Sequence, residues 1–440
     1  MTMNPLRVAH FNTFPYGGAA TAAMRIHRQL RSPAVNSQFY YHRDEQQSQL
    51  ESGFHQINFA PPKPGLFAGA RHRGKQKKRQ RKIYKLYNQH IALRPADVET
   101  FSMAELPEPT ELNWNAIDAD VVHLHWISFL ADYPSFFESI PDHVPIVWTL
   151  HDMNAFTGGC HYTNGCTRFQ HGCGGCKQVT NSGPHDVSAA SFVAKRESLK
   201  NKQIHVVTPS EWMRENAMKS DIWPDSTTFQ TIHYGLDLQT FSPAPQRLAR
   251  QTLGLPTDSA MIAFGAEDIN NKRKGFQHLL PALTNLDTNQ QVECIVFGSG
   301  EIEPIEGLPK IHHMGYVDSV KQQSLIYSAA DLVVVPSRED NQPQVGLESM
   351  ACGTPVVGFD AGGIPEYVRN LQTGLVAKIG DEQALAEKIS WLINHESDRL
   401  EMGTQARAMV ELEFEADIQS HQYASLYQSL ASPRQAHRVA

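Results

Sequence analysis

Short apolar runs alternate with longer segments of helical hydrophobic spacing along both halves of the chain. Runs of this length predict strands buried on both faces, and a helix after each strand is typical of parallel sheets covered by helices. Eight runs carry this pattern: Arg7–Phe14, Asp120–Trp126, Pro145–Leu150, Ile204–Pro209, Ala260–Gly265, Gln291–Gly298, Asp331–Pro336 and Thr354–Phe359. The pattern predicts an α/β chain with two Rossmann-like parallel sheets, whose ligands bind beyond the carboxyl ends of the strands.

The sequence FSPAP, at Phe241–Pro245, interrupts the regular pattern near the middle of the chain. A chain of 440 residues also exceeds the size of one ordinary core. We therefore expect a first domain over residues 1–240 and a second over 241–414. Most apolar residues of Glu411–Leu430 fit one helical face, which predicts a C-terminal helix over 415–432 that packs back on the first domain.

The composition of the chain excludes several classes of protein. Hydrophobic residues make up 41% of the chain and charged residues 19%, a balance typical of globular enzymes and not of disordered chains. The net charge of -7 argues against nucleic acid as the main partner. No apolar run approaches the roughly 20 residues that span a bilayer, and the N-terminus lacks the pattern of a secretory signal. These features predict a cytoplasmic protein.

One segment departs from the overall charge: Arg71–Lys85 contains nine Lys and Arg residues. The simpler interpretation is a solvated loop or helix face. The alternative is a surface for anionic lipid head groups or a lipid-diphosphate acceptor, which would place the protein peripherally on the inner face of a membrane. Nucleic acid is poorly supported, because no interleaved aromatic residues accompany the basic residues.

The segment Glu339–Glu366 carries the most specific pattern in the chain. After the strand that precedes it, Pro343 suits the first turn of a helix on which Glu348 lies, near the ligand end of the sheet. A carboxylate there can accept hydrogen bonds from both ribose hydroxyls of a nucleotide. Gly362 and Gly363 allow close backbone approach and open a further helix, which suits a diphosphate. An ordinary turn explains a lone glycine pair, but the whole run favours a nucleotide site.

This segment resembles the nucleotide-sugar site of the retaining glycosyltransferases of sequence family 4, which have the two-domain GT-B fold. The family motif has two acids eight residues apart, then a Cys-Gly and Thr-Pro-Val-Val run and a glycine pair. The run ACGTPVV, Ala351–Val357, matches closely, and the second acid is Glu348. The first acid falls on Asp340 in place of the family's Glu, with Glu339 beside it. The resemblance implies that Asp340 or Glu339 faces the donor sugar.

Other family motifs match elsewhere in the chain. They are the glycine loop Gly17-Gly18-Ala19, the pair His151-Asp152, the interdomain motif Tyr234–Asp237 with Phe241, and the turn Gly298-Ser299-Gly300. The resemblance implies that Gly17 and Gly18 face the donor phosphates and the acceptor, that His151 touches the donor sugar, and that Gly298 lies near the base. On the strand before His151, His123 and His125 alternate; packing is their simpler role, although one could line the cleft.

Sugar transfer requires stabilisation of a departing nucleoside diphosphate and of an oxocarbenium-like sugar. Lys274, directly before a glycine, matches the diphosphate-binding Lys of the family; Arg273 is the best candidate for its Arg, with Lys272 as the alternative. These cations would make a catalytic metal or other cofactor unnecessary. By resemblance, transfer is expected on one face of the sugar without a protein nucleophile, and the leaving phosphate helps to deprotonate the acceptor.

The expected function is retaining transfer, of hexosyltransferase type, from a UDP- or GDP-linked sugar to a glycan or lipid-linked glycan. The region His151–Cys176 is most similar to family members that build bacterial exopolysaccharide and lipopolysaccharide, so polysaccharide biosynthesis is the expected context. The alternative is a catalytically silent nucleotide-sugar-binding scaffold, suggested by Asp340 in the place of Glu and by the unusual spacing of Arg273.

Four of the six cysteines lie close together: Cys160, Cys166, Cys173 and Cys176. The last two have the spacing of a zinc knuckle, and four thiolates could close a tetrahedral structural zinc site. His161 or His171 could replace one of them. A pair of disulfides is the other interpretation, less favoured in a reducing cytosol, and an iron–sulfur cluster is less favoured still.

Overall fold

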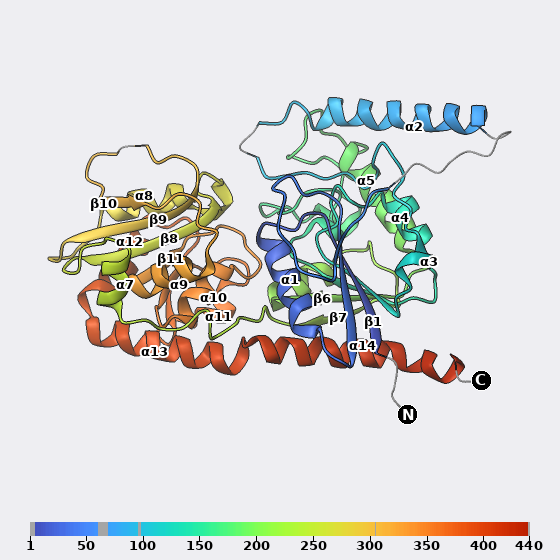
Figure 1. Cartoon of the computed structure of the whole chain (residues 1–440). Helices are drawn as coiled ribbons and strands as arrows, with labels where there is room; N and C mark the ends of the chain where they lie inside the picture. Colours follow the sequence, from blue (N-terminus) through green and yellow to red (C-terminus); the bar gives the residue numbers. More distant parts are fainter. Residues whose placement is uncertain (1–4, 60–68, 96–97, 304, 439–440) are drawn as a thin grey trace. The chain divides into compact units, whose positions relative to one another are not determined.

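The computed structural model describes residues 5–59, 69–95, 98–303 and 305–438. The chain forms two compact units, and each is an α/β unit built on one parallel sheet (Figure 1). The first unit comprises Met1–Pro209, Met213–Ile232 and Ser420–Ala440; the second comprises Ser210–Trp212 and His233–Gln419. The predicted fold class, two Rossmann-like parallel sheets, is confirmed.

The first unit contains a seven-stranded sheet of order β3-β2-β1-β4-β5-β6-β7, with every neighbouring pair parallel. Its strands are β1 Leu6–Asn12, β2 Val35–Tyr41, β3 Phe54–Gln56, β4 Val121–Leu124, β5 Ile146–Thr149, β6 Ile204–Thr208 and β7 Thr228–Thr231. Its helices include α1 Gly18–Leu30, α2 Gly69–His90, α3 Trp114–Ile117, α4 Tyr133–Ser139 and α5 Val187–Leu199; α6 Glu211–Met218 begins at residues of the second unit. Because all strands run the same way, the loops after β1, β4 and β5 leave one edge of the sheet.

The second unit contains a six-stranded parallel sheet of order β10-β9-β8-β11-β12-β13. Its strands are β8 Ala260–Asp268, β9 Val292–Ser299, β10 Lys310–His313, β11 Leu332–Val335, β12 Val356–Phe359 and β13 Gly374–Ala377. Its helices are α7 Gln246–Thr252, α8 Phe276–Thr284, α9 Val320–Ala329, α10 Gln344–Ala351, α11 Ile364–Tyr367, α12 Glu382–Asn394 and α13 Glu396–Glu413. The loops after β8, β9, β11 and β12 share one edge of this sheet.

All eight strands predicted from apolar runs form, within three residues at either end. The prediction missed five others: β2, β3, β7, β10 and β13. In β2, the sequence VNSQFYY alternates buried and exposed residues, so its apolar run is broken. The strands β3, β7, β10 and β13 have three or four residues each, and all four lie at sheet edges, where polar residues are tolerated.

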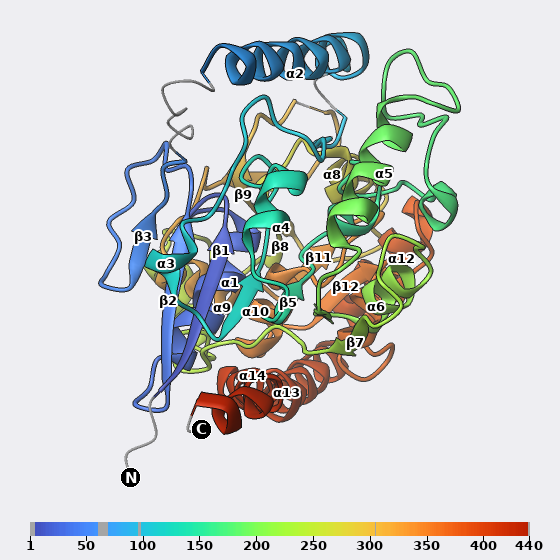
Figure 2. The same ribbon diagram turned by 90° about the vertical axis from the view of Figure 1, so that its right-hand side faces the viewer.

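The C-terminal helix α14, Ala416–Arg438, crosses back to the first unit, as predicted. Tyr423 and Tyr427 are fully buried there, in a core cluster with Val8 and Val121. In Figure 2, α14 follows α13 and leads to the C-terminus. After the short stretch Ser210–Trp212, the chain passes into the main part of the second unit at Ile232/His233 and not at residue 240.

The segment after Ile232 belongs to the second unit because its backbone pairs there. The Leu236 N–H donates to the Phe414 carbonyl at 2.8 Å, and the Ala416 N–H donates to the Leu236 carbonyl at 2.9 Å. The Tyr234 N–H donates to Gln342 Oε1 at 2.8 Å. These bonds tie the family-like motif Tyr234–Asp237 to the second unit.

The basic segment forms most of α2, a helix at one end of the first unit, outside its sheet (Figures 1 and 2). One side of α2 is anchored, because Ile83 is buried and Arg79 pairs with the buried Asp132. The side chains at 71–73 lie outside the described residues. Among the described helices, none combines the length and apolar character that crossing a membrane requires.

Candidate active site

The second unit brings two predicted cations and one predicted acid together at the ligand edge of its sheet. The Asp340 carboxylate, in the loop after β11, accepts a hydrogen bond from Lys274 Nζ at 2.7 Å. The same oxygen lies 3.1 Å from Arg273 Nη1 and accepts a hydrogen bond from Ser337 Oγ at 3.1 Å. Lys274 and Arg273 come from the loop after β8, so two loops far apart in sequence meet at Asp340.

Asp340 is only 5% exposed. Burial alone would raise its pKa, but the charges of Lys274 and Arg273 outweigh burial and hold the pKa of this carboxyl well below its usual range. Asp340 is therefore ionised at neutral pH. It holds both cations in place before any ligand arrives, which is the preorganisation that stabilisation of a leaving diphosphate requires.

Glu339 and Lys272, the alternatives to Asp340 and Arg273, have different surroundings. Glu339 is half-buried, and its backbone carbonyl accepts a hydrogen bond from Arg273 Nη1 at 3.0 Å. Lys272 is exposed. The structure thus groups Arg273 with Lys274 at Asp340 and leaves the side chain of Lys272 on the surface.

Glu348 lies on α10 and is 5% exposed. Its carboxylate accepts a hydrogen bond from the hydroxyl of Tyr327 at 3.0 Å, and Tyr327 on α9 is itself fully buried. The bond restricts the orientation of the carboxylate. Tyr327 could not be linked to Glu348 from the sequence, because the two lie 21 positions apart on different helices.

Gly362 and Gly363 follow β12 and pack on the Asp340 loop. Gly362 has φ +58°, and a Cβ there would lie 1.8 Å from the Asp340 carbonyl oxygen. The Gly363 N–H donates to that carbonyl at 3.0 Å, and a Cβ on Gly363 would lie 2.0 Å from the Asn341 carbonyl oxygen. The close packing of the two loops therefore requires both glycines. Their contact with a diphosphate stays a prediction.

Gly298 lies near the end of β9, at the same edge of the second sheet. Its φ is +134°, and a Cβ there would lie 2.0 Å from the Ala266 carbonyl oxygen. The register of β8 against β9 shifts between Gly265 and Asp268, so the backbone around Gly298 is irregular as well as crowded. The residue thus has a structural requirement, and its predicted place near the base is untested.

In the first unit, Gly17 and Gly18 lie between β1 and α1. Gly17 is the residue before the helix and has φ +88°. Gly18 faces open space, since a Cβ built on it would have no described atom within 4 Å. Packing therefore does not explain a glycine at position 18, whereas close approach of a ligand would.

His151 follows β5 and is 9% exposed. Burial lowers its pKa to about 4, although the charge of Asp152 opposes the shift, so the imidazole is neutral near pH 7. With Trp126 and Asn154, it lines a small cavity about large enough for one water molecule. Its Nε2 lies 3.1 Å from His125 Nδ1.

Asp152 anchors the loop that carries His151. Its carboxylate accepts hydrogen bonds from Trp126 Nε1 at 2.7 Å and from the Asn154 N–H at 2.8 Å. It also lies 2.6 Å from His161 Nδ1, while His161 Nε2 contacts Ser102 Oγ at 2.8 Å. Both ring nitrogens of His161 are therefore engaged, which makes this residue a poor substitute for a cysteine in a zinc site.

The four clustered cysteines are all reduced, so the disulfide interpretation finds no support in this structure. Residues Gly172–Gly175 all have positive φ, a tight turn that carries Cys173, and the Gly158 N–H donates to Cys173 Sγ at 3.1 Å. Among the described residues, no three of these sulfurs lie within 4.8 Å of one another. Burial raises the pKa of Cys173 to about 12, so its thiolate needs a nearby cation.

The donor set nevertheless suits zinc, because cysteines after a tight turn with N–H···S bonds are typical of such sites. Lys195 adds a second observation. It is fully buried, and its ammonium group donates to the carbonyls of Asn154 and Thr157 beside the cysteine loop. A tetrathiolate zinc centre carries net negative charge, which such a buried cation would offset.

Comparison with known proteins fits this geometry. A family model described as "Glycosyl transferases group 1" matches residues 260–395, the part of the chain that holds Lys274, Asp340 and Glu348. The D-inositol 3-phosphate glycosyltransferase of Corynebacterium diphtheriae is 28% identical over 243 residues, which cover 51% of this chain and 56% of the relative. The chain thus spans about half the length of that relative. The putative colanic acid biosynthesis glycosyl transferase WcaC of Escherichia coli K12 is 24% identical over 364 residues, covering 80% of this chain and 82% of the relative.

Solved structures show the same fold over nearly the whole chain. Sucrose-phosphate synthase from Thermosynechococcus elongatus has a TM-score of 0.67 at 17% identity, covering 97% of this chain and all of that chain. Anabaena Alr3699/HepE, in complex with UDP and glucose, has a TM-score of 0.64 at 16% identity, covering 96% and 100%. At such identities these likenesses establish the fold alone. They show that the chain has the GT-B fold, and the family match shows that residues 260–395 of its second unit are similar to the group 1 glycosyltransferases.

Proposed function

We propose that this chain transfers a sugar from a nucleotide-sugar donor to a glycan or lipid-linked glycan, with retention of the anomeric configuration. The observation that carries the proposal is the group of Lys274 and Arg273 held at the buried Asp340, on the ligand edge of the sheet. Two fixed cations suit a leaving diphosphate. One relative is a GDP-mannose-dependent mannosyltransferase of Corynebacterium glutamicum, and the structurally similar Anabaena Alr3699/HepE was solved with UDP, so a UDP- or GDP-linked donor is proposed.

Each candidate site residue of the second unit has one role in this proposal. Lys274 and Arg273 bind the diphosphate, and Asp340 orients both of them. Glu348, oriented by Tyr327, accepts hydrogen bonds from the ribose hydroxyls. Because the Asp340 carboxylate is committed to the two cations, Glu339 is the better candidate to face the donor sugar.

The remaining roles follow the family resemblance. His151 contacts the donor sugar, Gly17 and Gly18 approach the phosphates and the acceptor, and Gly298 lies by the base. The transfer proceeds on one face of the sugar, and the leaving phosphate takes the acceptor proton without a protein nucleophile. A sugar covalently bound to a side chain, trapped with a slow donor and mapped by mass spectrometry, would contradict this route.

The proposed context is polysaccharide biosynthesis, since the relative WcaC is a putative colanic acid biosynthesis glycosyl transferase. A silent nucleotide-sugar-binding scaffold is the competing function. Incubation of the purified protein with a set of UDP- and GDP-sugars and an acceptor extract separates the two. A transferase releases nucleoside diphosphate in an acceptor-dependent manner, whereas a scaffold binds a donor without turnover.

We further propose that α2 contacts an anionic membrane surface. Its exposed residues include Lys75, Lys77, Lys78, Arg81 and Lys85. Tyr84 and Tyr87 on the same helix are 56% and 45% exposed, as expected of aromatic residues at a lipid head-group layer. The anchored side of the helix keeps these groups on the surface of the unit.

Replacement of Lys77, Lys78 and Arg81 by Glu is expected to weaken binding to vesicles rich in phosphatidylglycerol by more than about tenfold, since each basic residue contributes about 1 kcal/mol. Co-sedimentation at low and high salt measures the effect. Lys321→Glu, an exposed charge reversal on the second unit, is the control and should leave binding unchanged. Equal sedimentation of the triple variant and the wild type would show that α2 does not bind the membrane.

Structural zinc at Cys160, Cys166, Cys173 and Cys176 is the remaining proposal. We expect about one zinc ion per chain in the purified protein, bound by the four thiolates. Elemental analysis measures it, and Cys173→Ser should lose the metal and lower the melting temperature. Cys294→Ser, at a buried cysteine of the second sheet, is the control that should keep it. Four freely titrating thiols without stoichiometric zinc would leave the cysteines only a packing role.

A further inference from the structure

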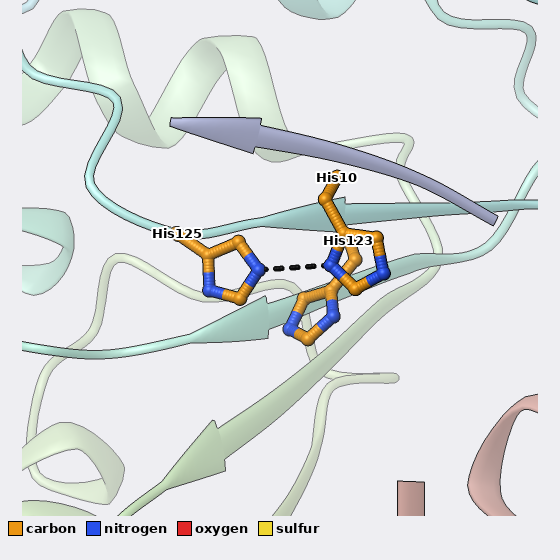
Figure 3. A group of neighbouring side chains, drawn as sticks. All are labelled: His10, His123 and His125. Carbon is orange, nitrogen blue, oxygen red and sulfur yellow. Dashed lines mark hydrogen bonds between the residues drawn. The ribbon is translucent and has the colours of Figure 1, made fainter. Parts of the chain in front are cut away.

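Buried histidines gather in the first unit next to His151. His10 lies on β1, and His123 and His125 lie on β4; His10 and His123 are fully buried, and His125 is 2% exposed (Figure 3). His10 and His123 are register partners of the paired strands. Such a group is unusual in the core of a sheet, where polar side chains need partners.

Three of the rings form a continuous chain. His151 Nε2 lies 3.1 Å from His125 Nδ1, and His125 Nε2 lies 3.0 Å from His10 Nδ1, the contact dashed in Figure 3. The chain ends at His10 Nε2, a buried nitrogen without a hydrogen-bond partner among the described residues. The chain runs from a candidate site residue into the core.

A metal ion is the first alternative explanation, since ligand nitrogens of His10, His123 and His125 lie within 4.8 Å of one another. The nitrogens of His123 are already used, however: Nε2 contacts Thr149 Oγ1 at 2.7 Å, and Nδ1 contacts the Tyr427 hydroxyl at 2.6 Å. Both nitrogens of His125 are used in the chain itself. A divalent ion would have to break these bonds and carry its charge into the core, which is costly.

The chain couples the tautomers of its members. Burial lowers the pKa of His125 and of His10 well below the ordinary value, so both rings are neutral, as His151 is. A neutral imidazole has one N–H and one acceptor nitrogen, and each N···N contact needs one of each. Only two arrangements satisfy both contacts: every N–H points toward His10, or every N–H points toward His151.

The end of the chain distinguishes the two arrangements. If every N–H pointed toward His10, its Nε2 would be a buried N–H without an acceptor. In the opposite arrangement that nitrogen is an unpaired acceptor, and orphaned buried donors are the rarer of the two in proteins. The favoured arrangement has His10 Nδ1–H donating to His125, and His125 Nδ1–H donating to His151 Nε2.

We infer that His125 and His10 are positioning residues, which hold the His151 ring in one orientation with its proton on Nδ1. His151 then offers an N–H donor from Nδ1 to an oxygen of the donor sugar, while its Nε2 is committed to His125. The inference deepens the proposed function and rests on the role of His151 proposed above. It parallels the orienting groups behind catalytic and metal-binding histidines, which act through tautomer and direction.

The most direct test is nitrogen NMR of the full-length protein labelled with ¹⁵N-histidine. The His151 signals are identified by their loss in His151→Gln. In the wild type, we expect His151 as a single tautomer protonated on Nδ1. His10→Phe keeps an aromatic ring beside Phe39 but removes the last imidazole of the histidine chain. In this variant, we expect His151 as an average of two tautomers. A single Nδ1–H tautomer unchanged in His10→Phe would overturn the inference, whatever the activity.

Kinetics supply the second readout. His125→Phe is expected to lower kcat by about tenfold to a hundredfold while donor KM changes by less than about threefold, because orientation and not binding is lost. His10→Phe should lower kcat by a smaller factor. The matched control is His27→Phe, a buried histidine of the same cluster whose Nδ1 contacts Ser37 outside the chain; it should retain kcat.

The outcomes separate the inference from the proposed function. If His151→Gln transfers sugar at the wild-type rate, the role of His151 fails, although the NMR experiment still determines whether the chain sets its tautomer. If His125→Phe does not fold, His10→Phe carries both readouts. Equal kcat losses in His10→Phe and His27→Phe would show a packing effect and would contradict a positioning role for His10.

Discussion

Lys274→Ala is expected to lower sugar transfer by about a hundredfold to a thousandfold, the usual cost of losing one preorganised group that stabilises developing charge. Lys274 Nζ lies 2.7 Å from the Asp340 carboxylate, so its removal also leaves that buried acid with Arg273 as its remaining cationic neighbour. Initial rates at saturating donor, with the release of nucleoside diphosphate as the signal, measure the effect.

Lys272→Ala is the matched comparison, because it removes an exposed Lys two positions away. We expect it to lose less than about tenfold, since a surface charge contributes little in water. Equal losses in the two variants would show that the whole basic turn acts as a diffuse charge. Wild-type rates in Lys274→Ala would show that Lys274, Arg273 and Asp340 do not form the diphosphate site.

The first unit is expected to lose stability steeply as the pH falls below about 6.5, the unfolded pKa of histidine. Among the described residues of the first unit, five buried histidines carry a lowered pKa: His10, His27, His123, His125 and His151. The pKa of the half-buried His205 is lowered as well. Burial is the main cause at each. For His27 and His151 the folded pKa is about 4. Between that pH and 6.5, the unfolded chain binds protons that the folded unit does not, so stability is complete above 6.5 and is lost as the pH falls.

The magnitude follows from proton linkage. Each proton taken up on unfolding changes the free energy of unfolding by about 1.4 kcal/mol per pH unit, so five give a limiting slope of about 7 kcal/mol per pH unit. Hydrogen exchange of peptides from β4 and β5, measured from pH 7 to 5, reports the first unit separately. His27→Phe and His10→Phe should each reduce the slope by about one proton. A slope near zero in the wild type would show that these rings are protonated or solvated in the folded unit.

The strands that carry the sites could be predicted because their signal is local. Apolar runs at Asp331–Pro336 and Ala260–Gly265 are continuous, and both form the buried centre of the second sheet. By contrast, β2 has alternating polar residues, and its place beside β1 is determined by packing across the sheet. The sequence predicts a solvated or lipid-binding surface at Arg71–Lys85 but not how it is anchored, because Asp132 lies 53 positions from its partner Arg79.

The site could be predicted as residue types but not as contacts. Motif spacing identified Lys274 and Asp340 separately, and their ion pair spans 66 positions through two loops that only the fold brings together. The sequence leaves Glu339 and Asp340 as equal candidates, and burial of Asp340 between two cations is the ground on which Glu339 is proposed. The sequence shows that His123 and His125 alternate on one strand. His10 comes from a different strand, so the sequence alone does not show the hydrogen-bonded histidines that lead to His151.

Sugar transfer is the most direct test of the proposed function. Wild type and Lys274→Ala, each incubated with individual UDP- and GDP-sugars and an acceptor extract, are compared for nucleoside diphosphate release and for sugar in the product. We expect acceptor-dependent release from one donor by the wild type, a product with the anomeric configuration of that donor, and little release by the variant. Binding of a donor by both proteins, without turnover by either, would contradict the proposed function.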